Sequence, residues 1–201
     1  MLLHSKTPEA SIASGYSQLT IGLGWRPESD KYDLDASCFL LGADGKTRRQ
    51  EDCVYFNQRR SLCGSVVHNG DNLVGKDEGD AETIDVDLTK TPSDVQKYIF
   101  TVSIYEAEFK NQRFHNVDNV YIRVVDKTTN LEIARFNLAD DAGDERTVIF
   151  GELYQRDGAW RFRALGQGFP GSLPELAESY GVVVDREELE QAALAYRQEK
   201  A

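Results

Sequence analysis

The sequence is poor in cysteine and in long hydrophobic runs, and each shortage excludes a class of protein. Its three cysteines, Cys38, Cys53 and Cys63, include no CxxC pair. This argues against a disulfide framework, a thioredoxin-type site and a zinc site made of cysteine pairs. No apolar run is long enough to cross a membrane, and MLLHSKTPEAS lacks the apolar core of a signal peptide. We therefore expect a cytoplasmic protein with free thiols.

Basic residues are also scarce, and this narrows the choice of partners. The 201 residues include 34 Asp and Glu against 23 Lys and Arg, a net charge of −11. Nucleic acid is disfavoured because its phosphates would be repelled, and anionic lipid is disfavoured unless a cation mediates the contact. The length fits a single domain, residues 1–201.

Catalytic motifs are lacking as well. The glycine-rich stretch TIGLGW has no G-x-G-x-x-G before a helix, so it is a weak match to a nucleotide-phosphate loop. His4, His68 and His115 lie in no Ser-His-Asp or Cys-His motif, and we expect structural or surface roles for them. The sequence predicts a protein that is not an enzyme.

What the sequence does contain is a series of short predicted strands. SQLTIGLGW and TIDVDL alternate between apolar and polar residues, whereas LDASCFLL is a continuous apolar run typical of a strand buried on both faces. Further strands are predicted at KYIFTVSIYEA, VYIRVVD, EIARFNL, TVIFGELYQ and AWRFRALG. Turn sequences such as ADGK and RDGA separate them, so the sequence predicts a mainly β fold, a sandwich or a barrel.

The C-terminal tail, from about residue 172 to 201, predicts two short helices. SLPEL begins with Ser172 as a cap and has Glu175 at the capping-box position. DREELEQAALAYRQEK predicts a second helix capped by Asp185. We expect the apolar stripe of this helix to pack against the β-structure; the stripe consists of Leu189, Ala192, Ala193 and Tyr196.

The segment HNGDNLVGKDEGDAETIDVDL, residues 68–88, gathers seven acidic residues and three glycines. Calcium prefers oxygen ligands, and glycines let a backbone fold so that such ligands converge. The segment offers Asp71, Asn72, Asp77, Glu78, Asp80 and Glu82. It has no EF-hand pattern, and a single His without Cys disfavours a transition metal. Composition alone leaves a calcium site and a solvated acidic loop as alternatives.

A second acidic pair lies in SDKYDLDAS, where Asp33 and Asp35 precede or enter the apolar strand. Residues two apart on a strand point to the same side, and carboxylates that meet a core are rarely left unpaired. Taken alone, this pair favours a salt bridge or a turn cap over metal ligation.

Three stretches then show a family resemblance: LTIGLGW…YDLDASCFLL, HNGDNLVGKDEGDAETIDVDL and VIFGELYQRDGAWRFRALGQGF. Their order and content, over about residues 17–184, resemble the bacterial tellurium-resistance TerD family, which includes TerZ-like and stress-protein paralogues. The resemblance implies a two-sheet β-sandwich that binds one or two Ca²⁺ ions. Carried over residue by residue, it implies the metal ligands Asp33, Asp35, Asp71, Asn72, Asp77, Glu78, Asp80 and Glu82.

Two positions depart from the family pattern, because Arg26 and Ala81 stand where relatives often have Asp. Both departures remove a carboxylate, which leaves one and two calcium ions as alternatives. Asp144 and Glu145, in a further polar loop, are expected to cap or to be solvated rather than to bind metal.

The resemblance also implies a role in tellurite resistance and stress response through complexes with paralogous proteins. We expect a calcium-stabilised scaffold or interaction module. One alternative is a peripheral membrane module, with Leu73 and Val74 as apolar tip residues and calcium bridging to lipid. Another is a small-ligand binder or enzyme with an unrecognised pocket. Direct tellurite chemistry is disfavoured, since the oxyanion would meet an acidic surface and no thiol pair is present.

Overall fold

The computed structural model describes residues 9–27, 32–71, 79–137 and 143–200, apart from the side chains of Pro27, Asp71 and Lys200. Within these residues the chain is mainly β, with two antiparallel sheets and two C-terminal helices. The predicted two-sheet sandwich with C-terminal helices is thereby confirmed.

The described elements run along the chain as β1 (Glu9–Ser11), β2 (Gln18–Pro27), β3 (Leu34–Leu41), β4 (Cys53–Val54), β5 (Val66–Asp71), β6 (Glu82–Asp87), β7 (Lys97–Ile104), β8 (Val117–Asp126), β9 (Leu131–Asn137), β10 (Thr147–Arg156), β11 (Ala159–Phe169), α1 (Leu173–Ser179) and α2 (Arg186–Lys200). Short 3₁₀ turns lie at Gln50–Asp52, Leu88–Lys90 and Phe114–Asn116.

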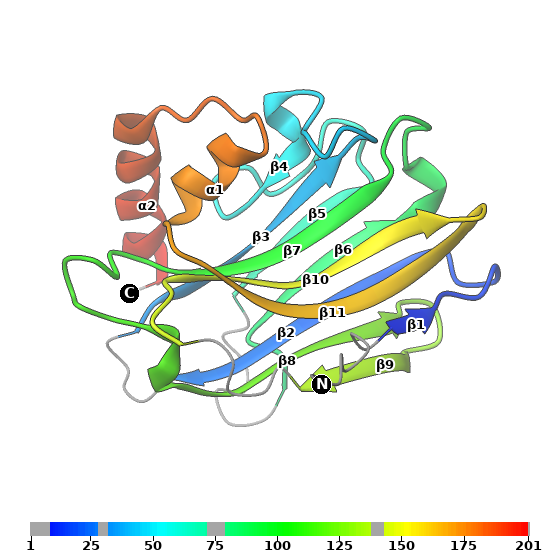
Figure 1. The fold of residues 1–201 in the computed structure, drawn as a ribbon, viewed down its shortest axis with the longest axis horizontal. Helices are drawn as coiled ribbons and strands as arrows, with labels where there is room; N and C mark the ends of the chain where they lie inside the picture. Colours follow the sequence, from blue (N-terminus) through cyan, green and yellow to red (C-terminus); the bar gives the residue numbers. More distant parts are fainter. Residues whose placement is uncertain (1–8, 28–31, 72–78, 138–142, 201) are drawn as a thin grey trace, which may run out of the picture.

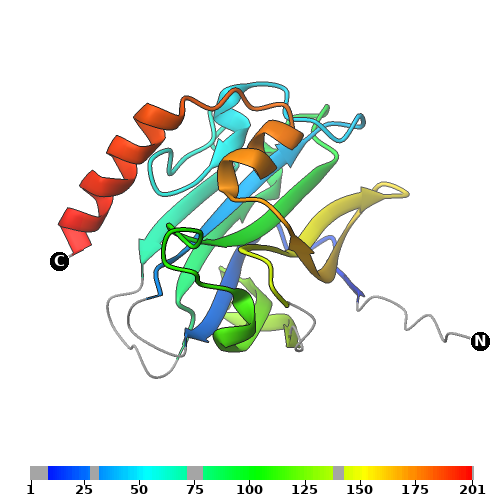
Figure 2. The same cartoon turned by 60° about the vertical axis from the view of Figure 1, so that its left-hand side comes forward.

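The two sheets and the helices form three layers (Figure 1). In the described chain, the first sheet has the strand order β1-β11-β10-β7-β3-β4 and the second has the order β5-β6-β2-β8-β9. The main core lies between the sheets, and α1 and α2 pack on the side of the first sheet that faces away from the second (Figures 1 and 2). Strand β3 therefore lies in the middle layer, beneath the helices.

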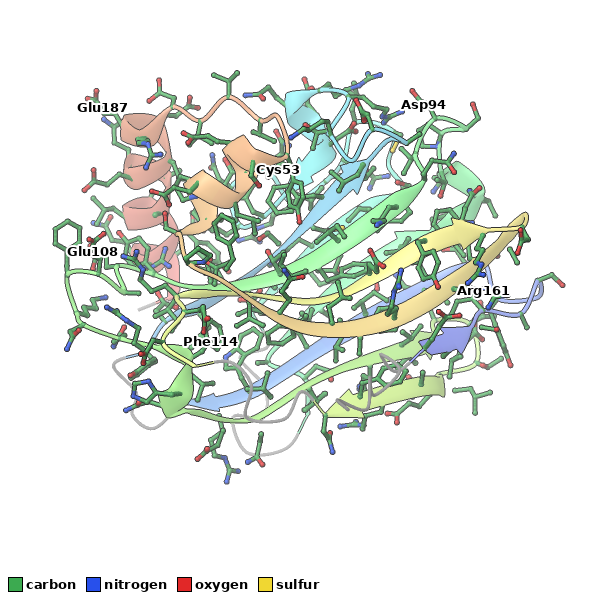
Figure 3. All side chains as sticks on the ribbon, viewed as in Figure 1. Cys53, Asp94, Glu108, Phe114, Arg161 and Glu187 are labelled. Carbon is green, nitrogen blue, oxygen red and sulfur yellow. The ribbon has the colours of Figure 1, made fainter. Side chains whose placement is uncertain are left out.

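Strand β3 is buried along its whole length because both of its faces are covered. Ala36 and Cys38 point into the core between the sheets. Phe39 and Leu41 point to the other face, where residues of α1 and the thiol of Cys53 join them (Figure 3). This explains the continuous apolar run. Asp35 belongs to the same helix-facing set, beyond Ser37, and contacts Arg197 near the end of α2.

Capping side chains define where the two helices begin, as the sequence predicts. Glu175 accepts a hydrogen bond from the backbone N–H of Ser172 at 2.8 Å. Asp185 accepts from the backbone N–H groups of Glu187 and Glu188 at 3.1 and 3.0 Å. The predicted apolar stripe of α2 packs on Phe56, and its contact residues are Leu189, Ala192, Ala193 and Tyr196.

The glycines of TIGLGW make room for side chains that cross β2 on its outer face. A Cβ added to Gly22 would lie 2.3 Å from Oδ2 of Asp80, and one added to Gly24 would lie 1.9 Å from Cε1 of Tyr121. Ile21 and Leu23 point into the core, so the two glycines face away from it. The glycine pattern reflects close packing here, rather than phosphate binding.

We predict that Gly22→Ala destabilises the protein by about 1–3 kcal/mol, because the new methyl group displaces the Asp80 carboxylate. Urea unfolding in the presence of a chelator measures this effect without any contribution from metal. Gly15→Ala is the matched control, because a Cβ at Gly15 meets no atom within 4 Å. Equal stability of the Gly22 variant and the wild type would contradict the close packing.

Candidate metal-binding end of the sandwich

The acidic pair at the start of β3 binds a guanidinium from the C-terminal helix. Asp33 Oδ2 lies 2.5 Å from Nε of Arg197, and Asp35 Oδ2 accepts a hydrogen bond from Nη2 of the same side chain. Asp35 is only 4% exposed, so its charge needs a close partner. The two carboxylates share one cation, as their two-residue spacing predicts.

The second acidic segment meets the first at Ala36. Glu82, the first residue of β6, is 2% exposed, and its Oε2 accepts a hydrogen bond from the backbone N–H of Ala36 at 2.8 Å. Strand β4 pairs only with Cys38 and Phe39 of β3. The edge of β3 at Ala36 is therefore open for a side chain of the other sheet. Segments 33–36 and 80–82 are thus joined directly through Ala36 and Glu82.

His68 completes this junction and is buried, as expected for a structural histidine. Its Nδ1 accepts from the backbone N–H of Gly70 at 2.9 Å. Its Nε2 lies 3.1 Å from the carbonyl oxygen of Ala36 and 3.0 Å from Oε2 of Glu82. Because Nδ1 accepts, the network assigns a neutral ring whose proton sits on Nε2, between two acceptors.

Asp80 belongs to the same segment but points to a different place. Its carboxylate lies over Gly22, on the outer face of the second sheet, and receives hydrogen bonds from Arg123 Nε and Nη2, both at 2.8 Å. Tyr121 Oη donates to Asp80 at 2.9 Å. Burial and this hydrogen bond raise the pKa of Tyr121. The structure does not bring Asp80 onto the guanidinium that holds Asp33 and Asp35.

The remaining predicted ligands are only partly described. Asn72, Asp77 and Glu78 lie outside the described residues, as do Leu73 and Val74, and Asp71 is described only as the last residue of β5. Among the described side chains, no three His, Cys, Asp or Glu groups converge as a metal cluster. The full predicted ligand set therefore stays a prediction.

Asp144 and Glu145 lie away from this junction. The side chain of Asp144 is 95% exposed, 3.4 Å from Nδ1 of His115. Glu145 lies against Gly168, where an added Cβ would come within 2.5 Å of its Cδ. The placement of Asp144 agrees with the expected solvation, whereas Glu145 packs against Gly168.

The donor groups at the junction suit a hard cation. Asp33, Asp35 and Glu82 supply carboxylate oxygens, and calcium prefers such ligands. At Asp33 and Asp35 the guanidinium of Arg197 supplies positive charge, as a metal ion bound there would. The carboxylate oxygens of these residues are therefore of the kind that calcium binds. The described part of the chain supplies fewer of them than the six to eight ligands that calcium takes.

Two cavities lie beside α2. One, of about 390 Å³, is lined by Asp35, Tyr105, Phe109, Arg186 and residues of α1 and α2. The other, of about 450 Å³, lies between α1, α2 and the segment around Tyr55.

The fold and this acidic junction define a class of protein: a two-sheet antiparallel β-sandwich whose carboxylates join distant chain segments at one end. The family model of the TerD domain matches residues 5–180. The chain belongs to the TerD family. In the described residues, no helix is both long and apolar enough to cross a membrane.

Several relatives cover most of the chain. A tellurium resistance protein TerD from Alcaligenes sp is 42% identical over 176 residues, which is 86% of this chain and 92% of the relative. General stress protein 16U from Bacillus subtilis (strain 168) is also 42% identical, over 85% of this chain and 90% of its own. These relatives support an assignment to the tellurium-resistance and stress-response group.

A solved structure supports the fold. The crystal structure of a homologue of the telluride resistance protein TerD from Streptomyces coelicolor A3(2) has a TM-score of 0.64 and 21% identity, covering 84% of this chain and all of that chain. Helix α2 lies beyond the residues that the family model matches.

We predict that Glu82→Leu destabilises the metal-free protein by about 1–3 kcal/mol, because the N–H of Ala36 loses its acceptor and His68 loses one of two. The measurement is urea unfolding in a chelator. Glu132→Leu is the control, since Glu132 forms only surface ion pairs with Arg123 and Arg135, and its loss is expected to cost less than about 1 kcal/mol. If both variants lose the same stability, the buried hydrogen bonds of Glu82 contribute no more than surface ion pairs do, which contradicts the prediction.

Proposed function

We propose that the protein is a non-enzymatic calcium-binding module of the tellurium-resistance and stress-response type. The observation that carries this proposal is the hydrogen bond between Glu82 and the backbone of Ala36, which brings together the two acidic segments predicted to share a cation. The names of the relatives support the biological setting, because they include tellurium resistance and stress proteins.

The proposed mechanism is a cross-link between distant parts of the chain. A bound calcium ion would supply two positive charges and accept six to eight oxygen ligands. Asp33 and Asp35 would present carboxylates from the start of β3, and Glu82 would hold the start of β6 beside them. Asp80 and the loop residues Asp71, Asn72, Asp77 and Glu78 complete the proposed ligand set. Binding to the folded chain alone stabilises it by mass action.

We place this module in the cytoplasm, as a scaffold that assembles with paralogous tellurium-resistance proteins. The three free cysteines support a reducing compartment. The buried thiols of Cys38 and Cys53 have raised pKa values, that of Cys53 about 12, so neither is an activated nucleophile.

The test is isothermal titration of chelator-stripped protein with calcium. We expect a dissociation constant on the order of 10⁻⁶ M or tighter, together with a rise in melting temperature. The double variant Asp71→Asn, Asp80→Asn is expected to lose most of this binding because two ligands lose their charge.

The matched control removes the same charge from the same stretch of sequence. Asp85→Asn, Asp87→Asn alters carboxylates that face outward from β6, where Asp85 bonds Thr20 and Asp87 caps Thr89. Calcium binding is expected to survive in this variant. Absence of both heat and a melting-temperature shift in the wild type would refute the proposed function.

A further inference from the structure

The guanidinium of Arg197 is enclosed by an acidic and aromatic cage. The cage is defined here as Asp33, Asp35, Tyr105 and Phe56. The Cζ atom of Arg197 lies 3.3 Å from the ring centroid of Tyr105 and 5.6 Å from that of Phe56. Two carboxylates and an aromatic face are what a cation requires of a binding site.

This cation comes from a segment beyond the family fold. The family model matches residues up to 180, and Arg197 lies in the fourth turn of α2, which begins at Arg186. Figure 1 shows the C-terminal end of α2 on the same side of the molecule as the start of β3, where Arg197 contacts Asp33 and Asp35. The cage is thus filled in cis by an appended helix.

Besides the cage, helix α2 is docked by its apolar stripe of Leu189, Ala192, Ala193 and Tyr196. Tyr196 stacks on Phe56 with ring centroids 5.0 Å apart, and Ala193 is buried beside them. At the other end of the helix Arg186 forms exposed ion pairs with Glu175 and Glu178, and Glu187 is exposed to solvent (Figure 3). The side chain of Arg197 is 16% exposed, so it is the most enclosed charge among the described side chains of the helix.

We propose that Arg197 is an internal competitor for the calcium site, so that calcium binding and docking of the end of α2 oppose each other. The inference rests on the proposed function, since Asp33 and Asp35 are both cage residues and proposed ligands. Their Oδ2 atoms contact the guanidinium, and a divalent cation at the same oxygens would repel it. Coupling is reciprocal, so the factor by which Arg197 weakens calcium binding equals the factor by which calcium weakens docking of the helix.

The experiment compares calcium titrations of the chelator-stripped full chain with those of Arg197→Gln. We expect Arg197→Gln to bind calcium at least about fivefold more tightly, the lower end of usual coupling between sites. Arg197→Lys, which keeps the charge but loses the planar fork, is expected to lie between the two. Arg186→Gln is the charge-matched control on the same helix, and its affinity is expected to equal that of the wild type.

A second readout follows the helix itself. Hydrogen exchange of the amides of α2 is expected to accelerate in the wild type on addition of calcium. In Arg197→Gln the exchange is expected to be fast already and to change little with calcium. Thermal unfolding checks that the sandwich remains folded in each variant.

The outcomes separate the two proposals. Equal calcium affinity in wild type, Arg197→Gln and Arg186→Gln, or exchange of α2 that calcium leaves unchanged in the wild type, overturns the competition and leaves calcium binding intact. Absence of calcium binding in the wild type overturns the proposed function, and the competition with it. An equal gain in Arg186→Gln would also overturn the competition, because the effect would then be one of net charge.

Discussion

The structure depends on one electrostatic constraint: the buried and half-buried carboxylates of the two acidic segments must each be met by a cation or a hydrogen-bond donor. Burial of an unpaired carboxylate is costly, and a chain of net charge −11 has fewer basic side chains than acidic ones. The described residues meet the constraint locally. Arg197 holds Asp33 and Asp35, Arg123 holds Asp80, and the N–H of Ala36 with His68 holds Glu82.

The same constraint links the layers of the fold. Glu82 and His68 come from the second sheet, and they satisfy the open edge of β3 in the first sheet. Arg197 comes from the helical layer and meets β3 on its other face. Strand β3 therefore forms hydrogen bonds with the second sheet and an ion pair with the helical layer at the place where its apolar run begins. This arrangement explains how acidic residues can directly precede and enter a fully buried strand.

In the proposed competition, calcium and arginine would satisfy the acidic pair differently. Arginine brings one charge and a fixed planar set of donors, whereas calcium brings two charges and gathers many oxygens. Held about 4 Å apart, the two cations would repel by about 2 kcal/mol in water and about 8 kcal/mol at an effective dielectric of 20. Under the proposed competition, an appended helix carrying a single arginine would tune the affinity of the metal site without any change in the ligands.

Much of the fold was predictable from local sequence, because alternation and capping are local properties. LDASCFLL predicted a strand buried on both faces, and Ser172 with Glu175 and Asp185 predicted the helix starts. Partners distant in sequence were not predictable. Asp35 and Arg197 are 162 residues apart, and an arginine in a polar helix looks like any solvated residue. Likewise, nothing local showed that Gly22 makes room for Asp80, or that His68 bridges Ala36 and Glu82.

The most direct test of this account is a crystal structure of the full chain grown with calcium. The account predicts an ion bound by carboxylate oxygens of Asp33 and Asp35, with the guanidinium of Arg197 withdrawn from both. An ion bound elsewhere, with Arg197 still in contact with the two carboxylates, would contradict it.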